Sequence, residues 1–509
     1  MKNSDNKKDI KEGISRRNVL KGLAALPFAG ALLGSSFRNR SIKHYSQHEN
    51  LNELKMGSTV PEALPVGHPV NNPMGQPFGI FPGRVVWVWD REATRSECTN
   101  TVTDDGPDFW FQDKNTDQEL VSRMIDTGVR QLTGKTTNRE SWDAIFRYHN
   151  ERVGKGNTGY ARGEKILIKC NFTSAFTMDN ETMRRNYNNV WGKASETSPQ
   201  VALAVLRHLI HDAGVPQNAI YIGDPQRNIY QEVYEKFHAE FPEVNYLGNN
   251  IFNANIKIVE NGRTPLTISE SELIFYSDKG VEMPDVIADK LYGIFEEIEY
   301  LLNIPMMKGH NGGGITAFPK NHFGSQARQS SAHLHDGLVY HREGYGKYRV
   351  NVDIMGSEYL GKKNLVYILD GLYPGPDWGD EPVKFRMSPF NDHWASSVFF
   401  SFDEVAIESV AFDFLRTELD GNNKYTEKAY PNYHGCDDNL HQAASESNWP
   451  HGIIYTPNKD GKKIPSLGVH EHWNNPHDKQ YSRNLGTASG IELVPVLVRE
   501  PLKQFLYDS

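Results

Sequence analysis

Short apolar runs alternate with amphipathic stretches between about residues 83 and 416. The runs at 83–89, 165–170 and 219–224 are six or seven residues long, as expected of strands that are buried on both faces. Residues 117–130 and 141–150 instead carry apolar side chains at helical spacing. This alternation predicts an α/β fold, with a mixed, largely parallel sheet flanked by helices.

One βαβ unit can be placed within this pattern. After the run at 165–170, Ser198 and Pro199 begin a predicted helix that extends to residue 211 and is closed by Gly214. The next strand follows at 219–224, so the two strands are expected to pair in parallel. Ligands of such sheets bind beyond the carboxyl ends of the strands, which makes Asn171, Asp224 and Arg227 candidate substrate-binding residues at one rim.

The same order of elements recurs further along the chain. Residues 300–307 are predicted as a strand that runs into a glycine-rich loop at 309–314, and 364–369 as a strand that ends at Asp370. Residues 402–416 have helical spacing, and Asp403 is interpreted as the N-cap. We therefore predict an α/β core at 81–416 and an irregular C-terminal extension at 417–509 that packs on it.

The N-terminal region carries a pattern typical of export. Arg16-Arg17 precedes the apolar run 22–33, and this run is shorter than the roughly 20 residues that a membrane span needs. The sequence therefore predicts a twin-arginine signal peptide at 1–34, a linker or N-terminal arm at 35–80, and a periplasmic or secreted protein without a membrane span.

Charge and cysteine content narrow the functional classes. The net charge is −9, and residues 1–34 contribute +4, so the remainder is close to −13 and does not suggest a nucleic-acid partner. Cys98, Cys170 and Cys436 allow one disulfide but not an iron–sulfur cluster bound by this chain alone. Sequence signatures of a lipase elbow, a P-loop, a dinucleotide site and a zinc protease are absent.

A basic, histidine-rich segment interrupts this acidic background. Residues 301–350 carry a net +4 and five histidines, which points to an anionic ligand. The basic residues are Lys308, Lys320, Arg328, Arg342, Lys347 and Arg349, and the histidines are His310, His322, His333, His335 and His341.

Several segments taken together resemble the domain of unknown function 362. Residues 303–310 (NIPMMKGH) correspond to its N-P-K-K-H segment, and 316–324 (TAFPKNHFG) to its T-x-x-x-K-N-x-F-G segment. The resemblance covers about 165–415. Many members carry ferredoxin-like cysteine clusters, which this chain lacks. It is more similar to a secreted twin-arginine branch from polysaccharide-degrading bacteria, and this similarity implies a dehydratase acting on oligosaccharides of the acidic polysaccharide ulvan.

Dehydration of a uronate requires a group that neutralises the carboxylate, a base, and a proton donor for the leaving hydroxyl. Segment 308–322 holds residues of each type. We expect Lys308, His310 and His322 to be catalytic, with the roles of the two histidines left open, and Asn311, Lys320 and Asn321 to bind substrate. From the extension, His434 and Arg483 are expected to close over the site, although packing explains them equally well.

Two pairs of histidines are candidate metal ligands, although the proposed chemistry requires no cofactor. His333 and His335, and likewise His470 and His472, would each share one face of an extended segment, as metal ligands do, but surface histidine pairs without metal are commoner. The main hypothesis is a lyase with an acidic oligosaccharide as its substrate. The alternatives are a redox or cofactor-carrying protein and a non-catalytic glycan-binding protein.

Overall fold

The computed structural model describes residues 63–498, apart from 250, 252–254, 282, 284, 339–343 and 429–432. The predicted signal peptide and most of the predicted arm lie outside the described residues. Where the chain is described, no helix is both long enough and apolar enough to cross a membrane. The observed mixture of parallel strands and covering helices confirms the predicted α/β class.

A parallel sheet contains the predicted βαβ unit. Its strand order is β11-β5-β6-β7-β8, and every neighbouring pair is parallel. The βαβ unit therefore pairs β5 directly with β6, as predicted from the sequence. The strands are β5 (Ile166–Cys170), β6 (Ile220–Gly223), β7 (Asn245–Gly248), β8 (Thr264–Pro265) and β11 (Tyr300–Ile304).

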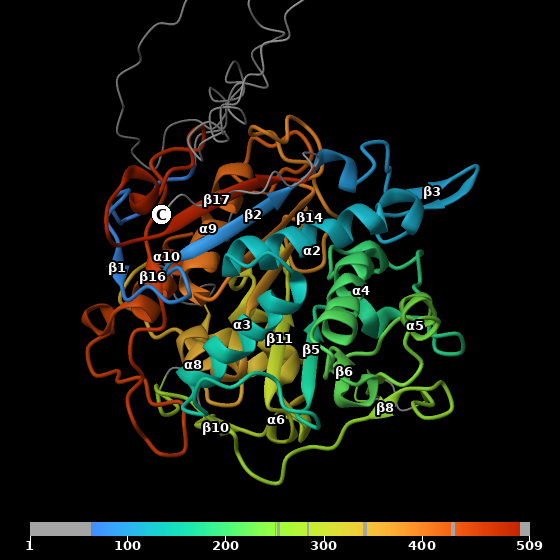
Figure 1. Ribbon diagram of the computed structural model, residues 1–509, viewed down its shortest axis with the longest axis horizontal. Coiled ribbons are helices and arrows are strands. Elements are labelled where there is room, and N and C mark those ends of the chain that lie inside the picture. Colours follow the sequence, from blue (N-terminus) through green and yellow to red (C-terminus); the bar gives the residue numbers. More distant parts are fainter. Residues whose placement is uncertain are drawn as a thin grey trace, which may run out of the picture.

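A second, mixed sheet has the order β13-β12-β14-β15-β2-β17. Its last strand, β17, lies parallel to β2, so the end of the described chain pairs with its beginning (Figure 1). The strands are β2 (Arg84–Trp89), β12 (Met306–His310), β13 (Gly314–Thr316), β14 (Tyr367–Gly375), β15 (Ser397–Ser401) and β17 (Glu492–Leu497).

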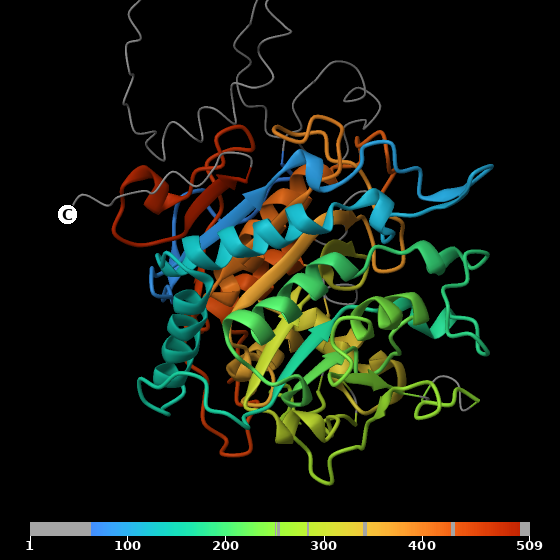
Figure 2. The ribbon, with the colours of Figure 1, turned by 45° about the vertical axis from the view of Figure 1, so that its right-hand side comes forward.

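Pro305 joins the two sheets. The sequence predicted one strand at 300–307, but the structure divides it into β11 and β12 on either side of this proline. Proline has no N–H to donate to a strand ladder, so the ladder is interrupted there. The Pro305 carbonyl still accepts a hydrogen bond from the Asp370 N–H (3.0 Å), which keeps β14 alongside. Figure 2 shows the yellow and orange strands of this junction side by side.

Helices cover both faces of the mixed sheet. Alternate residues of β2 point to opposite sides: Val86 and Val88 belong to one buried cluster with α2 (Gln118–Thr133), and Val85 and Trp87 to another with α9 (Glu404–Glu418). Strand β2 is therefore apolar at almost every position, because neither of its faces meets water. The Asp117 side chain caps α2 and that of Asp403 caps α9, which confirms the predicted N-cap.

The remaining helices range from four to 15 residues, and the remaining strands have two or three residues each. The other helices are α3 (Asn138–Arg152), α4 (Pro199–Arg207), α5 (Gln231–His238), α6 (Ile294–Glu297), α7 (Phe318–Asn321), α8 (Val350–Gly356) and α10 (Tyr433–Ala444). The other strands are β1 (Met74–Gly75), β3 (Thr101–Thr103), β4 (Gly106–Asp108), β9 (Ile274–Phe275), β10 (Ala288–Asp289) and β16 (Val469–His470).

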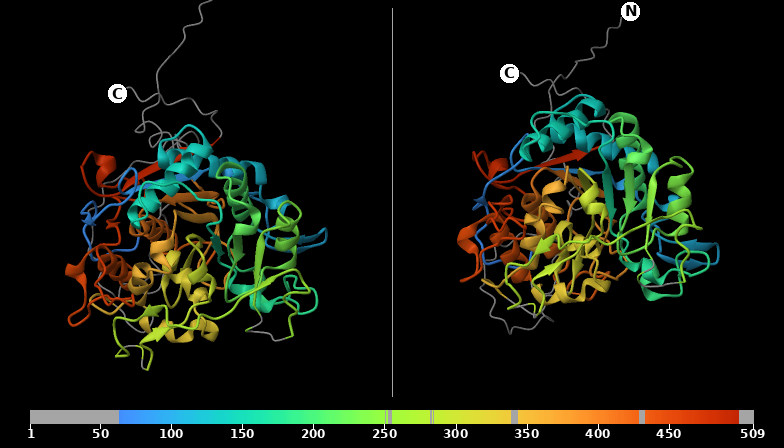
Figure 3. Two further views of the ribbon diagram at one scale, coloured as in Figure 1. Left: turned by 60° about the horizontal axis from the view of Figure 1, so that its bottom comes forward. Right: turned by 90° about the horizontal axis from the view of Figure 1, so that it is seen from below.

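The C-terminal extension is more regular than predicted. It contributes α10, β16, which pairs with β1, and β17 of the mixed sheet. Figure 3 shows its red elements packed along one side of the molecule, beside the blue N-terminal strands. The partners of β16 and β17 lie about 400 residues earlier in the chain, so no local pattern could reveal this pairing.

Two further local predictions need correction, and the state of the cysteines can now be given. Ser198 occupies the N-cap position of α4, but its hydroxyl makes no capping bond, and its N–H donates instead to Asp370 Oδ2 (2.6 Å). Strand β14 continues past Asp370 to Gly375. The three cysteines are buried and free, so the single disulfide that the sequence allowed does not form.

Candidate active site

The carboxyl ends of β5 and β6 meet at the predicted rim. The Lys169 Nζ lies 3.2 Å from Asp224 Oδ1, and the Phe172 N–H donates to Asp224 Oδ2 (3.1 Å). Both Lys169 and Asp224 are buried. The sequence had selected Asp224 and Asn171 from this rim but not Lys169, which lies inside the strand and reads as part of an ordinary buried run.

Helix α7 brings Asn321 to the same rim. Its Oδ1 accepts hydrogen bonds from Asn171 Nδ2 (3.0 Å) and from Lys169 Nζ (3.1 Å). Its Nδ2 donates to Asn303 Oδ1 (2.7 Å) at the end of β11. Asn321 therefore links the two parts of the predicted site, which lie about 150 residues apart in the sequence.

His322 follows Asn321 but is engaged within the protein interior. Its Nε2 lies 3.1 Å from Asn303 Nδ2 and its Nδ1 lies 2.9 Å from Ser325 Oγ. The Asn303 amide can only donate to this nitrogen, so the Nδ1–H must donate to Ser325. Burial, followed by repulsion from Lys169, holds the pKa of His322 well below its ordinary value. With both nitrogens used, His322 is suited to positioning Asn303.

His310 ends β12, and the glycine-rich segment forms a hairpin around it. Gly309 and His310 belong to β12 and Gly314 begins β13, so the predicted loop shrinks to the turn at 311–313. The N–H groups of Gly312 and Gly313 both donate to His310 Nδ1 (2.9 Å each). This nitrogen is therefore an acceptor, and in the neutral ring the proton sits on Nε2. Burial, followed by Lys320, holds the pKa of His310 well below its ordinary value.

Lys308 lies two residues earlier on β12 and is fully buried. Its ammonium group donates to the carbonyl oxygens of Ser195 (2.5 Å) and Trp378 (2.9 Å). Burial lowers its pKa to about 8, although the negative charges of Glu196 and Asp377 oppose the shift. Two carbonyl partners leave one ammonium proton for a ligand.

Lys320 differs from Lys308 because no oxygen of the described residues forms a hydrogen bond or ion pair with its ammonium group. Its side chain is 9% exposed, and its Nζ lies 3.9 Å from the centroid of the Phe323 ring. No carboxylate of the described residues pairs with it. Burial lowers its pKa to about 7, and repulsion from Lys308, Arg227 and Lys169 adds to this effect. A buried lysine with this pKa provides both amine and ammonium near neutral pH.

The rim therefore collects more positive than negative charge. Burial also lowers the pKa of the Arg227 guanidinium, whose Nε donates to the Thr173 carbonyl (3.1 Å). Asn171 Oδ1 and Thr316 Oγ1 are among the buried oxygens of the described residues that have no hydrogen-bond partner. Excess cations beside unused polar atoms suit an anionic, hydroxyl-bearing ligand.

A row of aromatic rings extends from Lys308 toward Arg227. The rings of Trp378 and Trp191 lie 5.5 Å apart, and those of Trp191 and Phe176 lie 5.4 Å apart. The Arg227 guanidinium lies 5.5 Å from the Phe176 centroid. Phe176 is 36% exposed, so the row reaches the surface. The sequence analysis missed these three residues, because they are widely spaced and belong to no motif.

The other predicted binding residues are more peripheral. Asn311 is exposed in the hairpin turn, where its backbone N–H donates to Asp377 Oδ1 (2.8 Å). The His434 ring lies 5.6 Å from that of Tyr345. Arg483 contacts the Pro82 carbonyl and bonds to Ile491 through its backbone, at the β2–β17 edge. The structure therefore joins neither His434 nor Arg483 to the rim through these contacts.

The two histidine pairs behave differently. His333 and His335 lie on a 3-10 helix (Gln329–Gly337), not on an extended segment, so their side chains diverge: His333 contacts Asp289, and His335 stacks on His310 at 5.8 Å. His470 and His472 lie on an extended segment. Their Nε2 atoms approach Asp437 Oδ1 to 3.1 and 2.8 Å.

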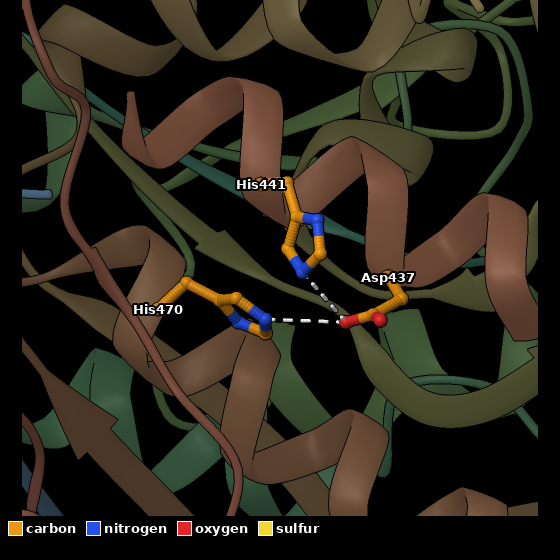
Figure 4. Close-up of side chains that lie close together, drawn as sticks. All are labelled: Asp437, His441 and His470. Carbon is orange, nitrogen blue, oxygen red and sulfur yellow. Dashed lines mark hydrogen bonds and ion pairs between the residues drawn. The ribbon is translucent and has the colours of Figure 1, made fainter. Parts of the chain in front are cut away.

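Asp437 is the centre of this second buried cluster. His441 contributes a third Nε2 atom, 3.4 Å from Asp437 Oδ1, and Figure 4 shows the imidazoles of His441 and His470 converging on the carboxylate. The ligand atoms of Asp437, His441 and His470 all lie within 4.8 Å of one another. The sequence analysis identified His470 and His472 but neither Asp437 nor His441, whose i,i+4 spacing on α10 was the available signal.

Comparison with known proteins identifies one family. The model described as "Domain of unknown function (DUF362)" matches residues 166–413, which include the parallel sheet and the strands β12 to β15 of the mixed sheet. This match supports the resemblance to that domain family over these residues. Neither a curated protein nor a solved structure is recognisably similar to the chain.

Proposed function

With residues 166–413 taken as a DUF362 domain, we propose that this protein is a carbon–oxygen lyase: a dehydratase acting on acidic, uronate-containing oligosaccharides such as ulvan fragments. The observation that carries the proposal is Lys320, a buried lysine without an oxygen partner among the described residues and with a pKa of about 7, surrounded by other cations. Such a group both attracts an anion and accepts a proton near neutral pH.

The substrate carboxylate would bind among these cations. His310 presents Nε2–H to it, because its Nδ1 is occupied by two glycine N–H groups. Lys308 retains one ammonium proton, which is directed to the leaving hydroxyl. A neutral imidazole in this state donates a hydrogen bond but does not accept a proton at Nε2. His310 therefore stabilises the negative charge that develops on the carboxylate, and it is not the base.

Lys320, in its amine form, takes the proton from the carbon beside the carboxylate. The released electron pair forms the carbon–carbon double bond while the bond to the neighbouring hydroxyl breaks, and the Lys308 ammonium protonates that hydroxyl to give water. Loss of one proton from Lys320 to solvent and gain of one by Lys308 restore the starting state. The pKa values of about 7 for Lys320 and about 8 for Lys308 match these two roles near neutral pH.

The aromatic row would hold the rest of the oligosaccharide. Trp378, Trp191 and Phe176 present successive rings beside Lys308 and Arg227, and aromatic faces pack well against the apolar faces of sugar rings. The Arg16-Arg17 signal supports an extracytoplasmic site of action, where polymeric substrates are first degraded.

The test is incubation of the purified full-length protein with ulvan oligosaccharides, followed by mass spectrometry and ultraviolet absorbance. We expect the loss of one water, about 18 mass units, and a new unsaturated-uronate chromophore. Lys308→Met should abolish both signals, whereas Lys362→Met, which changes an exposed lysine, should leave them unchanged. Binding of the oligosaccharide with no change in mass would replace the lyase by a glycan-binding protein.

A further inference from the structure

The histidine–carboxylate cluster in the C-terminal extension has the donor atoms of a metal site. Asp437 and His441 lie one helical turn apart on α10, and β16 contributes His470. All three side chains are buried. Two imidazole nitrogens and one carboxylate oxygen form a donor set typical of zinc and similar divalent ions.

The two distances from Asp437 Oδ1 to the histidine nitrogens match metal coordination. For bonds of about 2.0–2.1 Å, two ligands of a tetrahedral zinc ion lie about 3.3 Å apart. Asp437 Oδ1 lies 3.4 Å from His441 Nε2 and 3.1 Å from His470 Nε2. The 2.8 Å distance to His472 Nε2 is shorter and corresponds to a hydrogen bond onto the carboxylate. His472 is therefore a supporting residue.

His441 provides an independent sign of a missing partner. Its Nε2 atom is buried and makes no hydrogen bond with any described residue. Buried polar side-chain atoms nearly always have a partner, and this one points toward the oxygen of Asp437 (Figure 4). An ion between the two side chains would supply that partner.

Two of the three residues, His470 and Asp437, have hydrogen-bond partners on their outer atoms, as metal ligands usually do. His470 Nδ1 lies 2.8 Å from Ser409 Oγ, which leaves its Nε2 directed at the cluster. Tyr345 donates its hydroxyl proton to Asp437 Oδ2 (2.7 Å), and this bond directs Oδ1 inward. Metal-ligating side chains characteristically have such partners on their outer atoms.

We propose that Asp437, His441 and His470 bind one divalent transition-metal ion of the zinc class. Three protein ligands leave a fourth position for water. The ion would join α10 to the segment that carries β16, two parts of the extension that lie about 30 residues apart in the sequence.

The bound ion would also fix the position of α10, which packs against one side of the candidate active site. Cys436 precedes Asp437 on α10 and packs against Gly314 at the start of β13, where a Cβ atom would come within 2.8 Å of the Cys436 Cβ. Strand β13 pairs with β12, which carries Lys308 and His310. The position of α10 therefore affects the hairpin, while the metal ligands remain separate from the reacting groups.

Zinc titration of the chelator-treated full-length protein, followed by isothermal calorimetry, tests the proposal. We expect about one zinc ion per chain. Cobalt(II) should give the visible absorption of a tetrahedral site. Circular dichroism before titration would establish that the metal-free protein is folded. A folded wild-type protein that takes up less than about a tenth of an equivalent of zinc would overturn the proposal.

Two variants locate the ion. His441→Ala should weaken zinc binding by about 100-fold or more, because one of three ligands is lost, whereas His477→Ala, at an exposed histidine of the same extension, should bind as the wild type does. Unchanged binding by folded His441→Ala would refute the assignment. If His441→Ala does not fold, Asp437→Asn keeps the shape of the side chain and should shift the cobalt spectrum. The readout is metal binding, so it is independent of whether the protein dehydrates oligosaccharides.

Discussion

Around Lys320 the buried charges are mainly positive, whereas around Asp437 a single carboxylate oxygen collects three imidazole nitrogens. In the first region Lys169, Lys308 and Arg227 surround a lysine that has no carboxylate partner in the described chain. In the second region, the Nδ1 atom of His472 lies 2.9 Å from Asp413 Oδ1, while its Nε2 atom faces Asp437. Both regions are almost closed to solvent, so their charges are poorly screened.

The difference lies in which kind of partner each region lacks. The Lys320 region has cations in excess, which suits a substrate carboxylate, and unused oxygens, which suit the substrate's hydroxyl groups. The Asp437 region has acceptors directed at one point, including the unused His441 Nε2, which suits a cation. The burial of a charged group therefore does not by itself identify a ligand. The ligand is indicated by the sign of the uncompensated charge and by the direction of the atoms that have no hydrogen-bond partner.

Lys320→Met should have the largest effect on the first region. Without the amine, we expect the dehydration rate to fall by about 10⁴-fold, close to the upper range for loss of a general base. The wild-type rate should rise as the pH increases through about 7, because Lys320 must be deprotonated to act. Stopped assays across this pH range check both points, with Lys362→Met as the matched control. A variant that keeps the wild-type rate would exclude Lys320 as the base.

His472→Ala should have the largest effect on the stability of the second region. The change leaves the Asp413 and Asp437 carboxylates buried without the group that bridges them, at a cost of about 3 kcal/mol in unfolding free energy. His477→Ala removes an exposed imidazole from the same segment and should cost less than about 0.5 kcal/mol. Urea denaturation of both variants measures this difference. Equal stabilities would mean that the bridge contributes nothing.

Gly314→Ala should connect the two regions. The residue has a φ of +77°, and its added Cβ would lie 2.8 Å from the Cys436 Cβ. We expect a loss of about 2 kcal/mol, from backbone strain together with the displacement of α10. Gly214→Ala provides the control, since Gly214 has a similar φ of +73° but no atom within 4 Å. If both variants lose the same stability, contact with Cys436 has no part in the effect.

The pH dependence of stability should show a smaller contribution from Lys320. Its pKa is about 7 in the folded protein, whereas an ordinary lysine has a pKa of 10.5. Between these two pH values the unfolded chain therefore binds more protons than the folded protein does. The unfolding free energy should therefore rise with pH in this window, with about 1 kcal/mol per pH unit from this group. Comparison of wild type with Lys320→Met by urea denaturation isolates the slope. An unchanged slope would show that Lys320 is protonated normally.

Local signals in the sequence were sufficient for much of the fold. The apolar runs predicted β2, β5 and β6, and the βαβ order predicted that β5 and β6 pair in parallel. Asp403 was predicted as a cap because capping depends on residues within one turn. These features depend on neighbours in the chain, so a single sequence displays them.

Features that depend on distant residues were missed. Strand β17 pairs with β2, and Asp370 accepts a hydrogen bond from the backbone N–H of Ser198 at the N-cap of α4. The aromatic row joins Phe176, Trp191 and Trp378, which share no motif. None of these relations has a local signal, because each arises when separate segments pack together.

The sequence by itself determined the kinds of chemistry that are present: a basic, histidine-rich segment on an acidic chain and an extended His470–His472 pair. Only the tertiary structure decided which groups are paired. It turned His310 Nδ1 toward two glycine N–H groups, engaged both nitrogens of His322, and placed Asp437 and His441 opposite His470. Protonation and ligand preference depend on burial and on the nearest polar atoms, and these are set when strands and helices from distant parts of the chain come together.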